Sequence, residues 1–207
     1  MTIEVLRRMT PTEVRAAVNG FSARYVKDWD AWLAANHNAR PELFGRTLRK
    51  WQATRPLAMR RLRVEAHHGA PFLDDLLEST TRPLSVLGDL TVMTVEARTQ
   101  QHEEALTDLW DVFSRLPTDR RASCVGITKA VLLLTDGRIG PALDSRVRSA
   151  TGVRPPTTCG DWLQILEDVR DDIVAFESAH GPLSKAVPAR HAHLAYGRLY
   201  DMALGPR

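Results

Sequence analysis

One lysine and one aspartate stand out in the stretch from Val125 to Val147. Lys129 is conspicuous because the 28 basic residues are 24 arginines and only 4 lysines, and no other lysine lies in a hydrophobic segment. A guanidinium cannot give up its proton, whereas an amine can, and a neutral amine is a nucleophile. Asp144 follows shortly after and supplies a carboxylate, which can stabilise positive charge on a substrate. The pair therefore predicts covalent chemistry at an electrophilic carbon.

Two successive helices are expected to position this pair. Lys129 should lie near the start of a helix that continues through the apolar run Ala130–Leu134. There the helix dipole and the apolar neighbours should lower the pKa of the amine. A second helix is expected to begin near Pro141, because the fixed φ of proline suits a first helical turn. Asp144 would then lie among free backbone N–H groups, which favour a carboxylate.

The same stretch resembles the helix-hairpin-helix DNA glycosylase superfamily, which includes 8-oxoguanine glycosylase and endonuclease III. In that family a glycine-containing hairpin precedes a helix whose lysine attacks C1′ of deoxyribose in the bifunctional members. A P-x-x-D-type segment then carries the catalytic aspartate. Here Gly126 matches the hairpin glycine, displaced by one position, Lys129 matches the lysine, and Pro141-Ala142-Leu143-Asp144 is similar to the aspartate segment.

The resemblance implies an all-α, glycosylase-like fold with two helical lobes around a cleft. It implies a DNA glycosylase, with or without lyase activity, that flips a damaged or otherwise modified base out of double-stranded DNA and excises it. Lys129 would form a Schiff base at C1′, and Asp144 would face the positively charged sugar. Both DNA repair and defence against phage with modified DNA fit this activity. No cofactor or metal is expected, since Cys124 and Cys159 are too few for an iron–sulfur cluster.

Basic residues predict where DNA would bind. The segment from Leu43 to Val64 holds seven basic residues and no acidic one, so phosphate binding there should weaken steeply with salt. The hairpin around Ser123–Thr128 would hold a phosphate through backbone N–H groups. The predicted DNA contacts are Ser123, Val125, Gly126, Thr128, Arg46, Arg49, Lys50, Arg55, Arg60, Arg146 and Arg148. The predicted base-pocket residues are Trp51, His68 and Phe72.

Proline and glycine mark the ends of the expected helices. Apolar residues recur every three or four positions in each segment, which is typical of amphipathic helices. The β-branched run Thr91–Val95 is read as a possible short strand. Helices are expected within Pro11–Asn36 (one long or two short), from Pro41, from Pro71, over Gln101–Leu116, from Gly160 to Gly181, and after Pro188. Residues 1–207 are expected to form a single helical domain, with the hairpin and catalytic segment at 120–150.

Composition sets the broad class. With 207 residues, 43% hydrophobic and 26% charged, the chain has the values of an ordinary soluble globular protein. No uninterrupted apolar run is longer than Ala130–Leu134, which is far too short to cross a bilayer. We therefore expect no membrane association, a monomer, and a cytoplasmic location with nucleoid association through DNA.

Two alternatives remain open at this point. A non-catalytic helix-hairpin-helix DNA-binding module would keep the architecture without the chemistry, and the displaced Gly126 favours it. An all-α protein-interaction domain needs no catalysis, but it leaves the basic segment unexplained.

Overall fold

Helices are the only regular secondary structure in the computed structural model, which describes residues 2–54, 71–116 and 122–206, with residues 71–74 described by their backbone alone. The all-α class is thereby confirmed. No helix in these ranges is long and apolar enough to cross a bilayer. The α-helices are α1 (Pro11–Asn19), α2 (Ala23–Ala34), α3 (Arg40–Lys50), α5 (Pro71–Leu87), α6 (Gln100–Ser114), α7 (Cys124–Leu134), α8 (Ser145–Thr151), α9 (Cys159–His180), α10 (Leu183–Ala186) and α11 (Tyr196–Leu204), and the 3-10 helices are η1 (Leu6–Arg8), η2 (Val95–Ala97) and η3 (Ala189–His191).

Capping side chains and prolines fix where the helices begin. Thr10 before α1, Thr99 before α6 and Thr158 before α9 each form a capping box with the residue three positions later. Each box satisfies backbone N–H groups that the first helical turn leaves free. The segment from Pro11 forms two short helices, and helices begin at Pro71 and, close to Pro41, at Arg40, as the sequence predicts.

The expectation of a strand at Thr91–Val95 is wrong. The Thr91 carbonyl accepts a hydrogen bond from the Thr94 N–H (3.1 Å), and the Thr91 N–H donates to Thr94 Oγ1 (3.0 Å). These local bonds close a turn that leads into η2. Threonine hydroxyls compete for backbone groups in this way, and the described residues offer no second strand for pairing.

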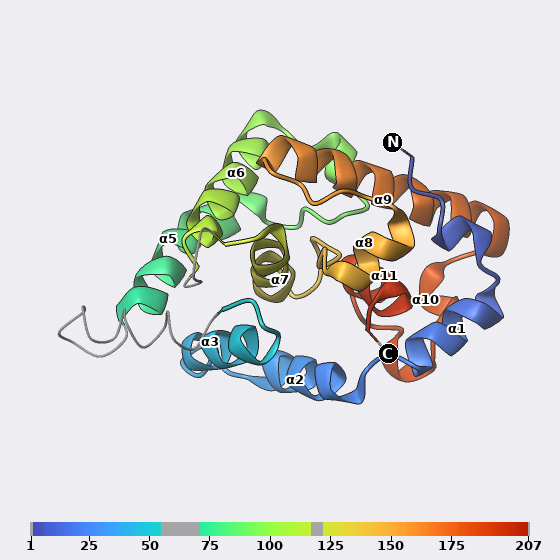
Figure 1. The fold of residues 1–207 in the computed structure, drawn as a ribbon, viewed down its shortest axis with the longest axis horizontal. Helices are drawn as coiled ribbons and strands as arrows, with labels where there is room; N and C mark the ends of the chain where they lie inside the picture. The colour runs from blue at the N-terminus through green and yellow to red at the C-terminus, as the bar shows by residue number, and fades with distance from the viewer. Residues whose placement is uncertain (1, 55–70, 117–121, 207) are drawn as a thin grey trace.

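Helix α7 lies in the middle of the molecule, seen nearly end-on in Figure 1. Helices α3 and α6 contact it, α5 packs along α6, and α11 packs against α1 and α8. Nine of its eleven residues are buried, from Cys124 through Leu133 with only Val125 partly exposed. A helix that is apolar on all sides is stable only when it is surrounded. Lys129 therefore lies in the interior.

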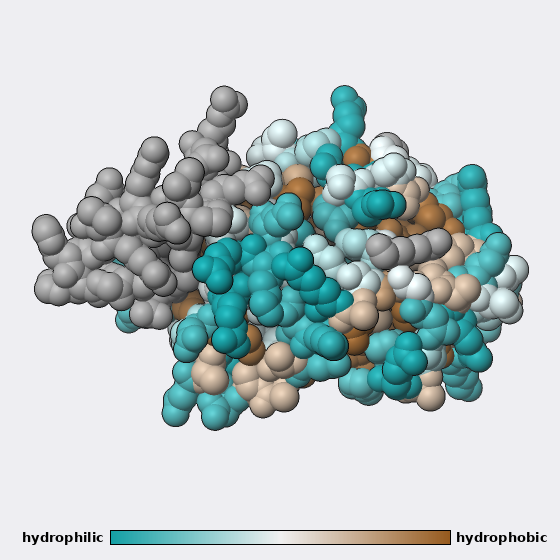
Figure 2. Space-filling view, turned by 60° about the horizontal axis from the view of Figure 1, so that its bottom comes forward, coloured by the Kyte–Doolittle hydropathy of each residue, from teal (hydrophilic) through white to brown (hydrophobic). Residues whose placement is uncertain are grey.

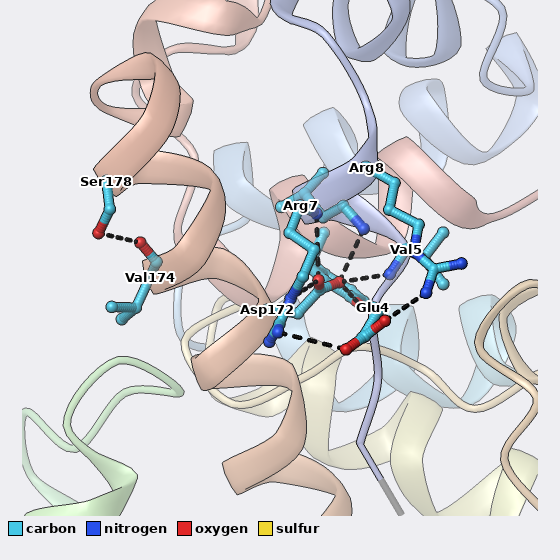
Figure 3. Close-up of polar contacts among 9 residues, drawn as sticks. Glu4, Val5, Arg7, Arg8, Asp172, Val174 and Ser178 are labelled. Carbon is cyan, nitrogen blue, oxygen red and sulfur yellow. Dashed lines mark hydrogen bonds and ion pairs between the residues drawn. The ribbon is translucent and has the colours of Figure 1, made fainter.

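A buried carboxylate joins the N-terminal segment to α9. Asp172 accepts hydrogen bonds from the backbone N–H groups of Val5, Leu6 and Arg7 at 2.7 to 3.2 Å, and from Arg7 Nε at 3.2 Å. The hydroxyl of Tyr200 on α11 donates to it as well, at 2.9 Å. Figure 3 shows the N-terminal segment, with Val5 and Arg7, lying against α9 at this carboxylate. Asp172 therefore holds three segments distant in sequence together.

Candidate active site around Lys129

The Lys129 amine is buried and is bound by a backbone carbonyl. Its side chain projects from α7, the residue is 7% exposed, and Nζ donates a hydrogen bond to the Trp51 carbonyl at 2.7 Å. No carboxylate of the described residues lies within ion-pair distance of it. Burial lowers the pKa of Lys129, while the negative charges of Asp144 and Asp201 oppose that shift. The result is an amine that loses its proton more readily than an exposed lysine does.

The turn after α3 supplies this carbonyl. Gln52 adopts a φ of 60°, in the left-handed region, and the chain closes with hydrogen bonds from Gln52 N–H to the Arg49 carbonyl and from Ala53 N–H to the Leu48 carbonyl. This is a Schellman motif, which ends a helix and turns the chain sharply. The turn then lies directly against α7.

Gly126 permits this close approach. A Cβ at this position would lie 3.1 Å from the Ala53 carbonyl oxygen, tighter than an ordinary contact. Gly126 is thus the third residue of α7, packed against the turn of α3. Its role in this structure is to let the α3 turn reach α7, close to Lys129.

Asp144 lies at the start of α8, but that helix begins later than the sequence suggests. The expected start near Pro141 is wrong, because α8 begins at Ser145. The preceding residues are buried and irregular, and the Leu143 N–H donates to Thr128 Oγ1 (2.9 Å) instead of entering a helix. Asp144 is the N-cap, and its Oδ1 accepts hydrogen bonds from the N–H groups of Arg146 (2.8 Å) and Val147 (3.0 Å).

Lys129 and Asp144 therefore share one electrostatic environment. The charge of Asp144 acts on the Lys129 amine without forming a direct ion pair with it. An amine that is not neutralised by a contacting carboxylate remains available for chemistry.

Two charged groups near this site are not among the residues predicted from the sequence. Arg198 and Asp201 on α11 are 2% and 4% exposed, and Arg198 Nη1 lies 2.5 Å from Asp201 Oδ2. Burial raises the pKa of Asp201 to about 6, with Asp144 adding to that shift and Arg198 and Lys129 opposing it. The signal was present in the sequence, as an Arg and an Asp three residues apart in a largely apolar helix, YGRLYDMAL.

The predicted DNA contacts fall into exposed and buried groups. Gly126 and Thr128 are buried. The Thr128 hydroxyl donates to the Cys124 carbonyl and accepts from the Leu143 N–H. Neither residue is therefore placed to bind a phosphate. Val125 and Arg148 are half-buried, and the Arg148 Nε donates to the Leu143 carbonyl. Arg55 and Arg60 lie outside the described residues. Exposed are Ser123, Arg46, Arg49, Lys50 and Arg146.

Trp51, expected in the base pocket, lies in the core instead. It is 2% exposed and stacks on Trp29 with 6.4 Å between ring centroids, and its Nε1 donates to Asp28 at 3.2 Å. A fully buried indole is not a surface on which a base can stack. His68 and the side chain of Phe72 lie outside what the structure describes.

A separate cavity of about 290 Å³ lies at the far end of α7. It is mostly apolar and is lined by residues of α2, α3 and α5 together with Leu134. Arg40 lies on its wall over the ring of Trp32 (4.7 Å) and pairs with Asp136 (3.4 Å). Neither Lys129 nor Asp144 lines this cavity, so it is distinct from the candidate active site.

Comparison with known proteins finds no matching family model, no similar curated protein and no similar solved structure.

Proposed function

We propose that this protein is a DNA glycosylase of the helix-hairpin-helix type that excises a modified base, in repair or in defence against foreign DNA. The observation that carries the proposal is the environment of Lys129. Its amine has a lowered pKa, is held by a carbonyl instead of a carboxylate, and shares its surroundings with Asp144. An amine of this kind, influenced by the charge of a carboxylate that does not contact it, fits nucleophilic attack at a carbon that develops positive charge.

In the proposed reaction, the neutral Nζ of Lys129 attacks C1′ of a flipped nucleotide. The bond between C1′ and the base breaks, its electron pair leaves with the base, and the proton lost by the amine balances the charge on the leaving base. Asp144 stabilises the positive charge on the sugar as this bond breaks. The covalent sugar adduct then opens to an imine. For the attack, Nζ must release the Trp51 carbonyl.

Exposed basic groups on two sides of the site support a DNA partner. Arg46 and Arg49 on α3 and Arg146 on α8 are exposed, and none forms an ion pair with a described residue. On α2, Arg24 Nη2 donates to the carbonyl of Lys50, which adds to the same basic end of α3. Hydrophilic residues cover much of the side that α2 and α3 form (Figure 2). In the proposed complex, the duplex binds the exposed basic residues of α3 and α8.

Covalent trapping tests the proposal directly. With borohydride and a duplex that carries an abasic site or one of a panel of modified bases, the wild type should form a stable adduct, because the imine is reduced to an amine. The variant Lys129→Gln should form none, while Lys185→Gln, which removes an exposed lysine on α10, should trap like the wild type. An adduct in Lys129→Gln, or none in the wild type with any duplex, contradicts the proposed chemistry.

A non-catalytic DNA-binding module is the second candidate. The 7% exposure of Lys129 and its hydrogen bond to the Trp51 carbonyl favour it, because a lysine with a purely structural role is also buried and hydrogen-bonded in this way. This candidate predicts DNA binding with no adduct under any condition. The third possibility from the sequence, a protein-interaction domain, predicts no DNA binding at all.

Salt dependence of DNA affinity tests whether the α3 arginines contact phosphate. The logarithm of affinity should fall linearly with the logarithm of salt concentration, by about 0.9 per phosphate neutralised. The double variant Arg46→Gln and Arg49→Gln should reduce this slope by roughly 2, as measured by fluorescence anisotropy. As a control, Arg8→Gln also replaces an exposed arginine with glutamine, but on η1. This variant should leave the slope unchanged. If the affinity of the wild type does not change with salt concentration, the proposed DNA binding is wrong.

A further inference from the structure

The cavity at the far end of α7 has the size of a small-molecule site. Its volume is about 290 Å³, whereas an apolar cavity of about 150 Å³ already holds a benzene molecule. Sites for small molecules begin at roughly 300 Å³. The cavity therefore has room for one compact molecule with an apolar body of roughly eight carbon atoms.

Apolar side chains from four helices form most of the cavity wall. They are Leu77 and Leu84 on α5, Leu134 at the end of α7, Trp32 on α2 and Pro41 on α3. Leu77, Leu84 and Leu134 are each only partly buried. An apolar body in the cavity would remove this surface from water, which favours binding.

Arg40 is the guanidinium group of this wall, and its contacts fix its position. Its guanidinium carbon lies 4.7 Å from the centroid of the Trp32 ring, and Nη2 lies 3.4 Å from Asp136 Oδ1. The Trp32 Nε1 donates to the same carboxylate oxygen at 2.8 Å. Among the described residues, none accepts a hydrogen bond from the Arg40 guanidinium, and the side chain is 31% exposed. Arg40 therefore keeps free donors on a group that is already oriented.

The polar part of the wall favours an anion. His37 lines the cavity as Arg40 does, and no aspartate or glutamate in the described ranges lines it. Arg40 is also the first residue of α3, whose N-cap, Ala39, supplies no capping side chain. The uncapped N–H groups and the helix dipole at this end attract negative charge. Glu42 in the same turn is exposed and does not line the cavity.

We propose that this cavity binds a small carboxylate with an apolar body of roughly eight carbons. The carboxylate lies against the Arg40 guanidinium, which can donate two parallel hydrogen bonds to it. The apolar body packs against Leu77, Leu84 and Leu134. The site does not include Lys129 and needs no DNA, so this proposal is independent of the proposed glycosylase function.

Octanoate is the probe that tests the site, by calorimetric titration of the full chain without DNA. Octanamide has nearly the same shape without the charge and should bind at least about tenfold more weakly, because hydrogen bonds to a charged group are stronger. Butanoate should bind more than about tenfold more weakly, since each buried methylene contributes roughly fourfold. No binding of octanoate at millimolar concentration, or equal binding of octanamide, overturns the proposal.

The role of Arg40 is tested by Arg40→Gln. This variant should bind octanoate at least about tenfold more weakly, while its affinity for octanamide stays the same. As a control, Arg82→Gln makes the same change at an exposed residue of α5 that does not line the cavity, and should bind octanoate like the wild type. Equal octanoate affinity in Arg40→Gln and the wild type overturns the proposal. Tighter binding of octylammonium than of octanoate also overturns it, because Asp136 and not Arg40 would then select the ligand.

A second variant and a resonance locate the ligand, and they also cover the case in which Arg40→Gln does not fold. Thr81 lines the cavity and is exposed, so Thr81→Phe should fold, narrow the cavity and weaken octanoate binding. In the wild type, octanoate should shift the indole N–H resonance of Trp32, which Trp32→Phe identifies among the five tryptophans. If octanoate binds with this resonance unmoved and binds Thr81→Phe unchanged, it binds elsewhere and the proposal is wrong.

Discussion

Asp172→Asn is expected to lower the free energy of unfolding by about 3–5 kcal/mol, a large share of the total for a protein of this size. The carboxylate accepts five hydrogen bonds, with Val5, Leu6 and Tyr200 on Oδ2 and two donors of Arg7 on Oδ1. An asparagine has nearly the same shape, but one of its two terminal groups is a donor.

The expected cost follows from what the amide would face. Whichever way the side chain turns, its NH₂ group meets either two donors of Arg7 or the donors on the other oxygen, and at least two hydrogen bonds are lost. Backbone N–H groups left unpaired in the interior cost about 1–3 kcal/mol each. The ion pair between Arg7 and Asp172 is lost at the same time.

The neighbouring residue gives a matched control. Asp171→Asn makes the same chemical change one position away, where the side chain is 54% exposed and pairs, within the described ranges, only with Arg170. Exposed pairs contribute little, so this variant should differ from the wild type by less than about 1 kcal/mol. Chemical unfolding should give a lower midpoint for Asp172→Asn with an unchanged slope. Equal midpoints for the two variants would show that Asp172 does not hold the N-terminal segment.

The sequence predicts most of the helices because their signals are local. Proline at the start of a helix and glycine after its end act through the backbone within one turn. The starts at Pro11 and Pro71 and the end before Gly181 follow from such residues. The burial of α7 likewise follows from its largely apolar composition.

The groups that complete the candidate site could not be predicted in the same way, because their partners are far apart in sequence. Lys129 and the Trp51 carbonyl are 78 residues apart, and Asp172 and Leu6 are 166 apart. A backbone carbonyl has no sequence signature at all. The start of α8 was misplaced for a similar reason, since the Leu143 N–H is taken by Thr128, fifteen residues earlier. Local preference gives way to tertiary contacts at each of these places.

Under the proposed glycosylase function, Asp144→Asn is expected to reduce base excision by roughly 10²–10³-fold while leaving folding and DNA binding nearly unchanged. Asn and Asp are equally good at the N-cap, because the side-chain oxygen of either accepts the hydrogen bonds of the first turn. The bonds from the N–H groups of Arg146 and Val147 to Oδ1 should therefore persist. The substitution removes the negative charge that faces the sugar in the proposed reaction.

Two comparisons isolate that charge. Asp144→Ala loses the cap as well and should cost about 1 kcal/mol of stability, so thermal unfolding separates the cap from the charge.

In Asp144→Asn the Lys129 amine also loses one of the two carboxylates that oppose its lowered pKa, so a larger fraction of it should be neutral. If Lys129 alone controlled the rate, Asp144→Asn would then excise bases as fast as the wild type or faster. A slower reaction despite a more readily deprotonated amine is the result expected if Asp144 stabilises the charge on the sugar. Single-turnover excision measured across pH, with anisotropy as the check on binding, distinguishes the two outcomes.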